Sequence, residues 1–380
     1  MSETYGKGLD VGTSRLVAMW REGDNPNPVK NDFRDCYLEL ADEDMEFIKS
    51  QGKMKLACIN DRYFALGEDA LVIANLLKQT VKRPMAKGIL NPVDDDAYDI
   101  LEELIGKILG EPRYPGEVCV ASIPADSSDG EISTIIHKSA VKQIIQKLGY
   151  TFKPINEGFA TLLALGPTAE KDGETIPFTG IALSFGGGMC NLCLAYRSKE
   201  IKTLSTAESG DWVDENVARG FVNVKPNQVT KFKEDYFKFG KVYTDAEIEA
   251  FGYKTPERKK YFKKMMMTLE QIYENLIENT INNFTTLLAG EDIDVPLEIV
   301  ISGGTSSPEG FEKKFEEVLR EMEDEFPIQI SNVRKSNDTL VSTATGALVW
   351  AMNHERKKQA ASGTVKEAPV TPEVTETPES

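Results

Sequence analysis

Two short hairpins with glycine turns constrain the fold more than any other feature of this chain. Residues 8–14 read GLDVGTS and residues 182–188 read ALSFGGG. In each segment an apolar strand reaches a turn of small residues, and a second apolar strand leaves it. The two segments align with one another, which indicates an internal duplication with one glycine turn in each half. At 380 residues the chain is long enough for two such domains.

Strands alternate with helices along the rest of the chain, which is typical of layered α/β domains. The stretch 256–288 carries apolar residues at helical spacing and predicts one long helix. The other predicted elements are strands at 8–11, 16–20, 118–123 and 297–302, a second hairpin over 180–197, and helices at 94–110, 129–148 and 308–322.

The composition excludes several classes of function. With a net charge of −17, the surface repels nucleic acid and anionic lipid. No apolar run approaches the ~18 residues that span a bilayer, and the polar first ten residues fit neither a signal peptide nor a membrane-inserting helix. Five cysteines without framework spacing indicate a reducing compartment. We therefore expect a cytoplasmic protein with no nucleic-acid partner and no direct membrane insertion.

The glycine turns suggest a phosphate site. Turns rich in Gly, Ser and Thr present several backbone N–H groups to one point, and glycine lets a ligand approach the backbone closely. Asp10, directly before the first turn, supplies oxygen atoms that could hold Mg²⁺ through water. Taken alone, however, either hairpin is better explained as an ordinary β-turn.

A third glycine site strengthens the ligand interpretation. Residues 301–306 (ISGGTS) leave a hydrophobic strand and enter a helix. The end of a strand beside a helix N-terminus is the usual ligand position in open α/β sheets. The segment matches neither the dinucleotide-binding fingerprint nor the P-loop pattern, so those two modes of binding are not supported.

In order and spacing, the three segments resemble the phosphate 1, phosphate 2 and adenosine motifs of the actin superfamily, which also contains heat-shock chaperones and sugar kinases. Segments 156–166 and 344–348 resemble its two connecting helices. The resemblance implies an actin-like (ribonuclease H-like) duplicated two-lobe α/β fold with a nucleotide cleft between the lobes. It also implies ATP or ADP with Mg²⁺ as ligands. The implied nucleotide-binding residues are Asp10, Gly12, Thr13, Ser14, Gly186, Gly187, Gly188, Gly303, Gly304 and Thr305.

Within the superfamily the chain is most similar to bacterial actins of the MamK group, and next to MreB. That resemblance places Lys233 and Glu234 at the ribose and base, although an ordinary exposed charge pair is the alternative. Counting from Pro124 as in MreB, it places Glu131 where a carboxylate orients the attacking water. The alternative for Glu131 is an acidic residue favoured by a helix N-terminus.

The second phosphate motif departs from the pattern of the family at two positions. Ser184 stands where the family carries Asp, and Met189 where it carries Thr or Ser, whereas Asn191 stands where the family carries Asp or Asn. Serine cannot supply negative charge to a metal or to the attacking water. We therefore expect nucleotide binding to survive and hydrolysis to be slow or absent.

The predicted domains are a first lobe of residues 1–150 with 335–356, a second lobe of 151–334, and a disordered acidic tail of 357–380. The resemblance implies ATP-linked self-assembly into cytoplasmic filaments that organise a magnetosome or another cargo through unidentified adaptors. Two alternatives stay open. One is an adaptor similar to FtsA or PilM that binds ATP and hydrolyses little. The other is a small-molecule kinase of the same superfamily.

Overall fold

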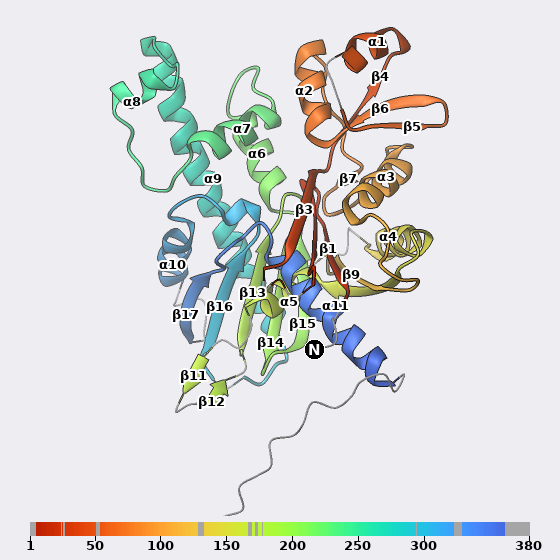
Figure 1. Cartoon of the computed structure of the whole chain (residues 1–380). Coiled ribbons are helices and arrows are strands. Elements are labelled where there is room, and N and C mark those ends of the chain that lie inside the picture. The colour runs from red at the N-terminus through yellow and green to blue at the C-terminus, as the bar shows by residue number, and fades with distance from the viewer. Residues whose placement is uncertain are drawn as a thin grey trace, which may run out of the picture.

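The computed structural model describes residues 5–23, 25, 27–50, 54–127, 133–165, 169–171, 174–176, 178–293, 295–322 and 329–361. Two α/β lobes stand side by side, and each is built on a five-stranded sheet (Figure 1). The first sheet has the order β10-β9-β1-β2-β3 and the second has the order β15-β14-β13-β16-β17. The strands of the first sheet are β1 (Lys7–Val11), β2 (Arg15–Trp20), β3 (Val29–Arg34), β9 (Val118–Ile123) and β10 (Thr151–Asn156). Those of the second sheet are β13 (Gly180–Phe185), β14 (Cys190–Tyr196), β15 (Lys199–Thr206), β16 (Leu297–Ser302) and β17 (Ile330–Lys335).

The two sheets repeat one topology. In each, an antiparallel hairpin carries the glycine turn, a third antiparallel strand follows on one side, and two parallel strands follow on the other. The internal duplication predicted from the two hairpins is therefore confirmed over whole sheets.

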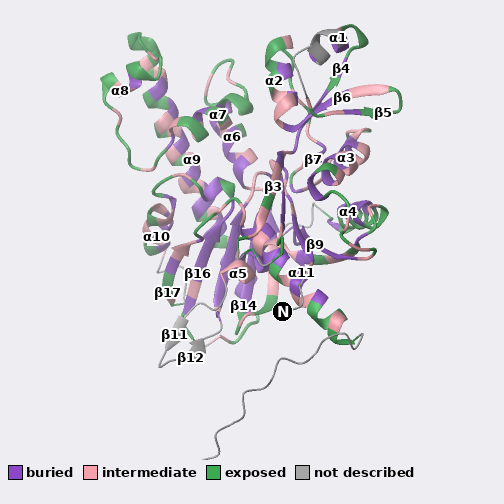
Figure 2. Cartoon of the chain, in the orientation of Figure 1, coloured by how far each residue is buried: buried purple, intermediate pink, exposed green. Residues whose placement is uncertain are grey.

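Helices cover the outer faces of the sheets, and each lobe has its own buried core (Figure 2). The first lobe uses α3 (Ala97–Leu109) and α4 (Ile135–Lys147), and the second uses α6 (Gly210–Arg219), the long α9 (Pro256–Leu288) and α10 (Phe311–Glu321). Cys190 and Cys193 are both buried in the second lobe, and neither forms a disulfide.

Each lobe carries a smaller part at the upper end of the cleft. In the first lobe it is a three-stranded sheet with two helices, which we call the tip. The tip consists of β4 (Tyr37–Leu40), α1 (Asp42–Ser50), β5 (Leu56–Ile59), β6 (Arg62–Leu66) and α2 (Gly67–Leu77). In the second lobe the corresponding part contains α7 (Pro226–Tyr236) and α8 (Asp245–Ala250). The remaining short elements are β7 (Met85–Ala86), β8 (Ile89–Leu90), β11 (Ala169–Lys171), β12 (Glu174–Ile176) and a 3-10 turn over Gly304–Ser306.

Two helices run between the sheets and join the lobes. Helix α5 (Glu157–Ala164) packs on β13 and β14, while α11 (Ser342–Ala361) packs on β1, β9 and α5. These are the two predicted connecting helices. The side chain of Asn156 begins α5 by accepting a hydrogen bond from the backbone N–H of Phe159 at 3.2 Å.

Two predicted boundaries need correction. Strand β10 pairs along its whole length with β9, so residues 151–156 belong to the first lobe rather than to the second. Helix α11 continues to Ala361, so the tail does not begin at residue 357. The last turns of α11 are held by the buried Glu355, which accepts a hydrogen bond from Val118 N–H, and by Lys358, which donates to the carbonyl of Gly116. Residues 362–380 lie outside the described residues, as does the start of the predicted 129–148 helix.

None of the helices in the described part of the chain is both long enough and apolar enough to cross a membrane.

The crossing of α5 and α11 supplies the first prediction. A Cβ placed on Gly346 in α11 would overlap the backbone carbonyl of Ala160 in α5. Gly346→Ala should therefore destabilise the chain by roughly 1–3 kcal/mol and lower its melting temperature. Gly106→Ala in α3 is the matched control, because its new Cβ would meet only Leu148 at 3.6 Å. That change should stabilise by about 0.5–1 kcal/mol through helix propensity. Equal melting temperatures for the two variants would show that the helices do not cross this closely.

Candidate functional site

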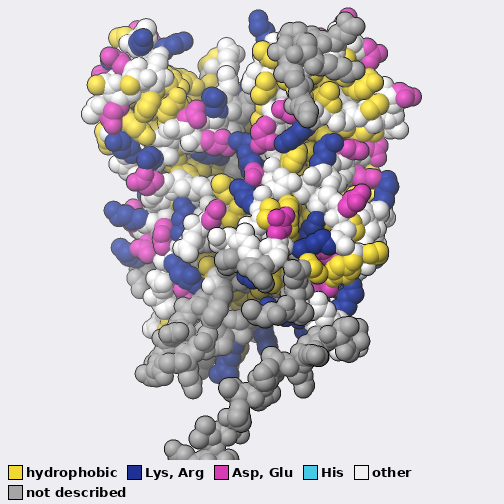
Figure 3. All heavy atoms as spheres, viewed as in Figure 1, with side chains coloured by type: hydrophobic (Ala, Val, Ile, Leu, Met, Phe, Trp, Pro, Cys, Tyr) yellow, Lys and Arg dark blue, Asp and Glu magenta, His cyan; other side chains and the backbone are white. Residues whose placement is uncertain are grey.

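A cavity of about 560 Å³ lies between the lobes and is lined by residues from both. Figure 3 shows the molecule hollowed between its two upper ends, with charged side chains of both signs on the surface around the hollow. All the predicted nucleotide-binding residues that the resemblance identified line this one cavity. They are Asp10, Gly12, Thr13, Ser14, Gly186, Gly187, Gly188, Lys233, Glu234, Gly303, Gly304 and Thr305.

The first two glycine turns face each other across the cavity. Each turn is closed by one backbone hydrogen bond. In the first turn Gly12 N–H donates to the carbonyl of Arg15 at 3.1 Å, and in the second Gly186 N–H donates to the carbonyl of Met189 at 2.9 Å. A Cβ on Gly187 would lie 3.0 Å from the Cβ of Ser14. The turns therefore meet so closely that only small residues fit between them.

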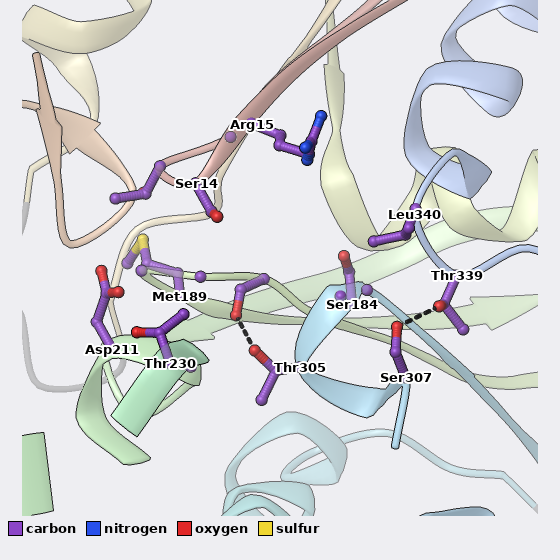
Figure 4. Close-up of a pocket in the computed structure, with 18 of the residues that line it drawn as sticks. Ser14, Arg15, Ser184, Met189, Asp211, Thr230, Thr305, Ser307, Thr339 and Leu340 are labelled. Carbon is purple, nitrogen blue, oxygen red and sulfur yellow. Dashed lines mark hydrogen bonds between the residues drawn. The ribbon is translucent and has the colours of Figure 1, made fainter. Parts of the chain in front are cut away.

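The third glycine segment is tied to the second turn. Gly303 adopts a φ of +91°, and a side chain there would collide with the carbonyl of Phe185, so the position requires glycine. Thr305 donates a hydrogen bond from its hydroxyl to the carbonyl of Gly186 at 2.6 Å (Figure 4). The buried Tyr273 donates in turn to the carbonyl of Thr305 at 3.1 Å. The 303–305 loop and the 186–188 turn thus form one rigid wall.

Two half-buried carboxylates lie at the cavity, from Asp10 on β1 and Glu157 at the start of α5. Ser122 donates a hydrogen bond to Asp10 Oδ1 at 2.9 Å, and Asn191 donates to Glu157 Oε2 at 2.7 Å. Burial raises the pKa of Asp10 to about 6, and the bond from Ser122 opposes the shift. Burial also raises the pKa of Glu157 well above its ordinary value, with the negative charge of Asp10 adding to the effect. The pair therefore favours either a proton or a cation beside it.

The donor set fits a hydrated cation better than one held by protein alone. Among the described residues, no group of three or more His, Cys, Asp or Glu side chains is arranged to hold a metal ion. Mg²⁺ usually keeps several waters and takes one or two carboxylates together with phosphate oxygens. Asp10 and Glu157 match that requirement.

Lys233 and Glu234 line the cavity but do not pair with each other. Lys233 donates to Asp214 Oδ1 at 2.6 Å, and Thr230 donates to the other oxygen of Asp214 at 2.6 Å. Glu234 pairs across the cleft with Arg34 at 3.2 Å. Lys233 is nearly buried, so the alternative of an ordinary exposed charge pair does not describe it. Glu234 is exposed, and its partner is Arg34 of the other lobe.

A second ion pair crosses between the lobes. Arg83 Nη1 lies 2.8 and 3.0 Å from the two carboxylate oxygens of Asp211, the second residue of α6. Both this pair and Arg34–Glu234 line the cavity. The cleft is thus closed in this structure by charged contacts as well as by the glycine turns.

The three positions of the second phosphate motif compared with the family have distinct surroundings. Ser184 is buried, and its side chain points into the same space as that of Ser14 (Figure 4). Met189 packs so closely on Gly88 that no side chain would fit there. Asn191 is fully buried, and its side-chain amide N–H donates the hydrogen bond that positions Glu157. The side-chain oxygen of Asn191 accepts a hydrogen bond from Ala125 N–H at 3.2 Å. Ser184 supplies no carboxylate, but Glu157 lines the same cavity and does.

Sequence reasoning missed several residues of the site: Glu157, Asp211, Asp214, Arg34 and Arg83. A signal existed for Glu157, since it begins a predicted connecting helix directly after a strand. No local signal marks the arginines, because their partners are far away in the sequence. Glu131 lies outside the described residues, so its catalytic role stays a prediction.

A duplicated two-lobe fold with a glycine-lined cavity between the lobes is the actin-like fold. The sequence profile of the Volactin family matches residues 5–351, and the chain belongs to that family.

Solved structures of other proteins share this fold at low sequence identity. A structure described as "MamK double helical filament" has a TM-score of 0.64 at 17% identity, over 91% of this chain and 98% of that one. MreB 5 of Spiroplasma citri bound to AMPPNP has a TM-score of 0.63 at 13% identity, over 96% and 100%. The ethanolamine utilization protein EutJ from Carboxydothermus hydrogenoformans has a TM-score of 0.52 at 15% identity, over 92% and 91%. No curated protein sequence matches the chain.

The buried charge of Asp10 predicts a specific pH dependence. Above pH 6 the carboxylate is charged in both the folded and the unfolded chain, so its burial opposes folding in full. Between about pH 4 and 6 only the folded chain keeps the proton, and at lower pH the penalty disappears. Asp10→Asn should therefore raise the melting temperature at pH 7.5, on the order of 2–4 °C. The gain should shrink as the pH falls through 6 toward 4.

The control for this prediction is Asp95→Asn, which changes an exposed carboxylate on the same lobe. It should leave the melting temperature nearly unchanged at every pH. A gain for Asp10→Asn that stays constant from pH 4.5 to 7.5 would rule out a buried charge at this position.

Proposed function

We propose that this chain binds ATP with Mg²⁺ in the cavity between its lobes, hydrolyses it slowly, and assembles into actin-like filaments. One observation carries the proposal. Three glycine segments from distant parts of the chain line a single cavity that also contains the half-buried carboxylates of Asp10 and Glu157. Backbone N–H groups bind the oxygens of a polyphosphate, and the carboxylates favour the cation that accompanies it.

The nucleotide would lie with its phosphates against the 12–14 and 186–188 turns, on the side that lines the cavity. The ribose and base would lie toward the 303–305 loop, Lys233 and Glu234, which form the part of the cavity on the second lobe. Two structures of MreB 5 from Spiroplasma citri with this fold are bound to AMPPNP and to ADP, which supports a nucleotide as the ligand. Mg²⁺ would be held by Asp10 through water, beside Glu157, and would neutralise phosphate charge.

Glu157 lines the same cavity and is a further carboxylate that we propose for the hydrolytic machinery. Burial and the charge of Asp10 raise the pKa of Glu157 well above its ordinary value, which makes the ionised carboxylate a stronger proton acceptor toward water. Asn191 fixes its orientation through the 2.7 Å hydrogen bond. Glu131 remains a second candidate for orienting the attacking water. Since Ser184 supplies no charge, we expect slow turnover.

Filament formation is the expected use of the nucleotide. A MamK double helical filament shares the fold over nearly the whole chain, which supports self-association of this protein. A bound nucleotide favours the state with closed lobes, and closed subunits would stack into a homopolymer. We place the filament in the cytoplasm, with a cargo or adaptor that recruits it.

The test measures assembly and hydrolysis on the same samples. The parent should pellet with ATP and Mg²⁺ and release phosphate slowly. Glu157→Gln keeps the shape of the side chain and its bond from Asn191 but removes the charge. It should reduce phosphate release at least tenfold and leave pelleting intact. Glu131→Ala tested alongside shows whether that residue shares the role.

Two outcomes would contradict parts of this account. Phosphate release by Glu157→Gln at the parent's rate would remove Glu157 from the hydrolytic machinery. Failure of the parent to pellet with ATP at any salt or Mg²⁺ concentration would remove the filament and leave the adaptor. Phosphate transfer to an added small molecule would instead indicate a kinase.

A further inference from the structure

The chain passes twice between the first sheet and the tip, and we call these two passages the neck. The first passage, residues 34–37, leads from β3 to β4, and the second, residues 81–85, leads from α2 to β7. Tyr37 and Lys82 hold the passages together by two backbone hydrogen bonds of 2.9 Å each. Asp35 lies on one passage and Arg83 on the other.

Arg83 connects the neck to the second lobe. It reaches across the cleft to both carboxylate oxygens of Asp211 at 2.8 and 3.0 Å. The backbone N–H of Asp211 donates in turn to the carbonyl of Gly187 at 2.7 Å. A single guanidinium therefore links the neck of the first lobe to the glycine turn of the second.

Asp35 is a buried carboxylate that this contact leaves unsatisfied. It is 1% exposed, and neither of its oxygens has a hydrogen-bond partner among the residues that the structure describes. The backbone N–H of Met85 lies close enough to lower its pKa without completing a hydrogen bond. A buried carboxylate without partners costs free energy, so a conformation that supplies one is favoured by that amount.

Arg83 is within electrostatic reach of both carboxylates. Burial lowers the pKa of Arg83, but Asp211 and then Asp35 raise it and outweigh the burial. Burial raises the pKa of Asp35 well above its ordinary value, and the charge of Arg83 is the largest opposing influence. The guanidinium is bonded to one carboxylate and lies near another that has no partner.

We propose that Arg83 is a two-position latch that holds the lobes together through Asp211 and turns back to Asp35 when the lobes separate. In the open molecule Asp35 gains the partner that it lacks here, and Arg83 exchanges the carboxylate of Asp211 for that of Asp35. Asp35 thereby offsets part of the cost of breaking the pair with Asp211. Because the proposed nucleotide site lies between the lobes, the latch would set how readily nucleotide enters and leaves; this consequence rests on the proposed function.

The movement of the lobes can be measured without any nucleotide. Of the five cysteines, Cys58 in β5 of the tip is exposed and the other four are buried. Val222, between α6 and α7 of the second lobe, is 89% exposed. Spin labels on Cys58 and on Val222→Cys would report the distance between the two sides of the cleft by electron–electron double resonance.

Three substitutions in the labelled chain test whether Arg83 has a different partner in the closed and in the open molecule. Asp211→Asn removes the partner of Arg83 in the closed molecule and should raise the ratio of long to short label distances by roughly fivefold or more. Asp35→Asn removes the partner of Arg83 in the open molecule and should lower that ratio by a similar factor. Arg219→Gln is the control, because it removes an exposed ion pair with Glu215 that lies within α6 and does not cross the cleft, and it should change the distances little.

The proposal fails if Asp35→Asn has the distance distribution of the parent, since Arg83 would then have one partner only. It also fails if Asp35→Asn opens the cleft as Asp211→Asn does, since Asp35 would then stabilise the closed state. Melting curves establish that each variant is folded, and Asp35→Ser replaces Asp35→Asn if the latter is not.

Release of a fluorescent ATP analogue distinguishes the latch from the proposed function. Release should be faster than the parent's in Asp211→Asn and slower in Asp35→Asn. If the label distances shift as expected but no analogue binds, the latch stands and the nucleotide proposal falls. If the analogue binds but neither variant changes the distances, the latch falls and the nucleotide proposal stands.

Discussion

Helices α5 and α11 cross at Gly346 so closely that the backbone of one touches the backbone of the other, and this contact joins the two lobes. One consequence is the position of the chemistry. Strand β1 packs on α11 and carries Asp10 near its end, while α5 begins with Glu157. A change in the helix crossing would therefore move the two carboxylates relative to each other as well as the lobes.

The cavity depends on a balance between backbone donors and buried negative charge. The glycine turns provide N–H groups for an anion, whereas Asp10 and Glu157 disfavour an anion that arrives alone. A polyphosphate together with a divalent cation satisfies both. The charged side chains around this centre are largely committed to each other, as in the pairs Lys233–Asp214, Arg34–Glu234 and Arg83–Asp211. Changes in their pairing give the protein a means of coupling the ligand to the positions of the lobes.

Much of the fold could be predicted from local signals. Apolar strands that run into glycine turns gave the two hairpins, and helical periodicity gave α9 at its observed limits. Strand β10 was not predicted, because its sequence, TFKPIN, contains a proline and exposed residues typical of a sheet edge. The boundary at residue 150 therefore left it in the second lobe. The partner of β10, strand β9, lies well before it in the chain. The end of α11 was misjudged because the composition changes near residue 357, whereas Glu355 and Lys358 extend the helix through contacts with the first sheet.

The three glycine segments of the site were predictable from local sequence, because each follows an apolar strand. The ion pairs were not, since Arg83 and Asp211 are separated by 128 positions and only the fold brings them together.

Titration calorimetry with ATP on the full-length chain, with and without Mg²⁺, tests the central claim most directly. The account predicts one site per chain, with affinity at least tenfold higher in Mg²⁺ because the cation offsets the charges of Asp10 and Glu157. Asp10→Asn should lose most of that difference and keep the weaker, metal-free binding. Binding of ATP that is equally strong with and without Mg²⁺, or an absence of heat in both titrations, would contradict the account.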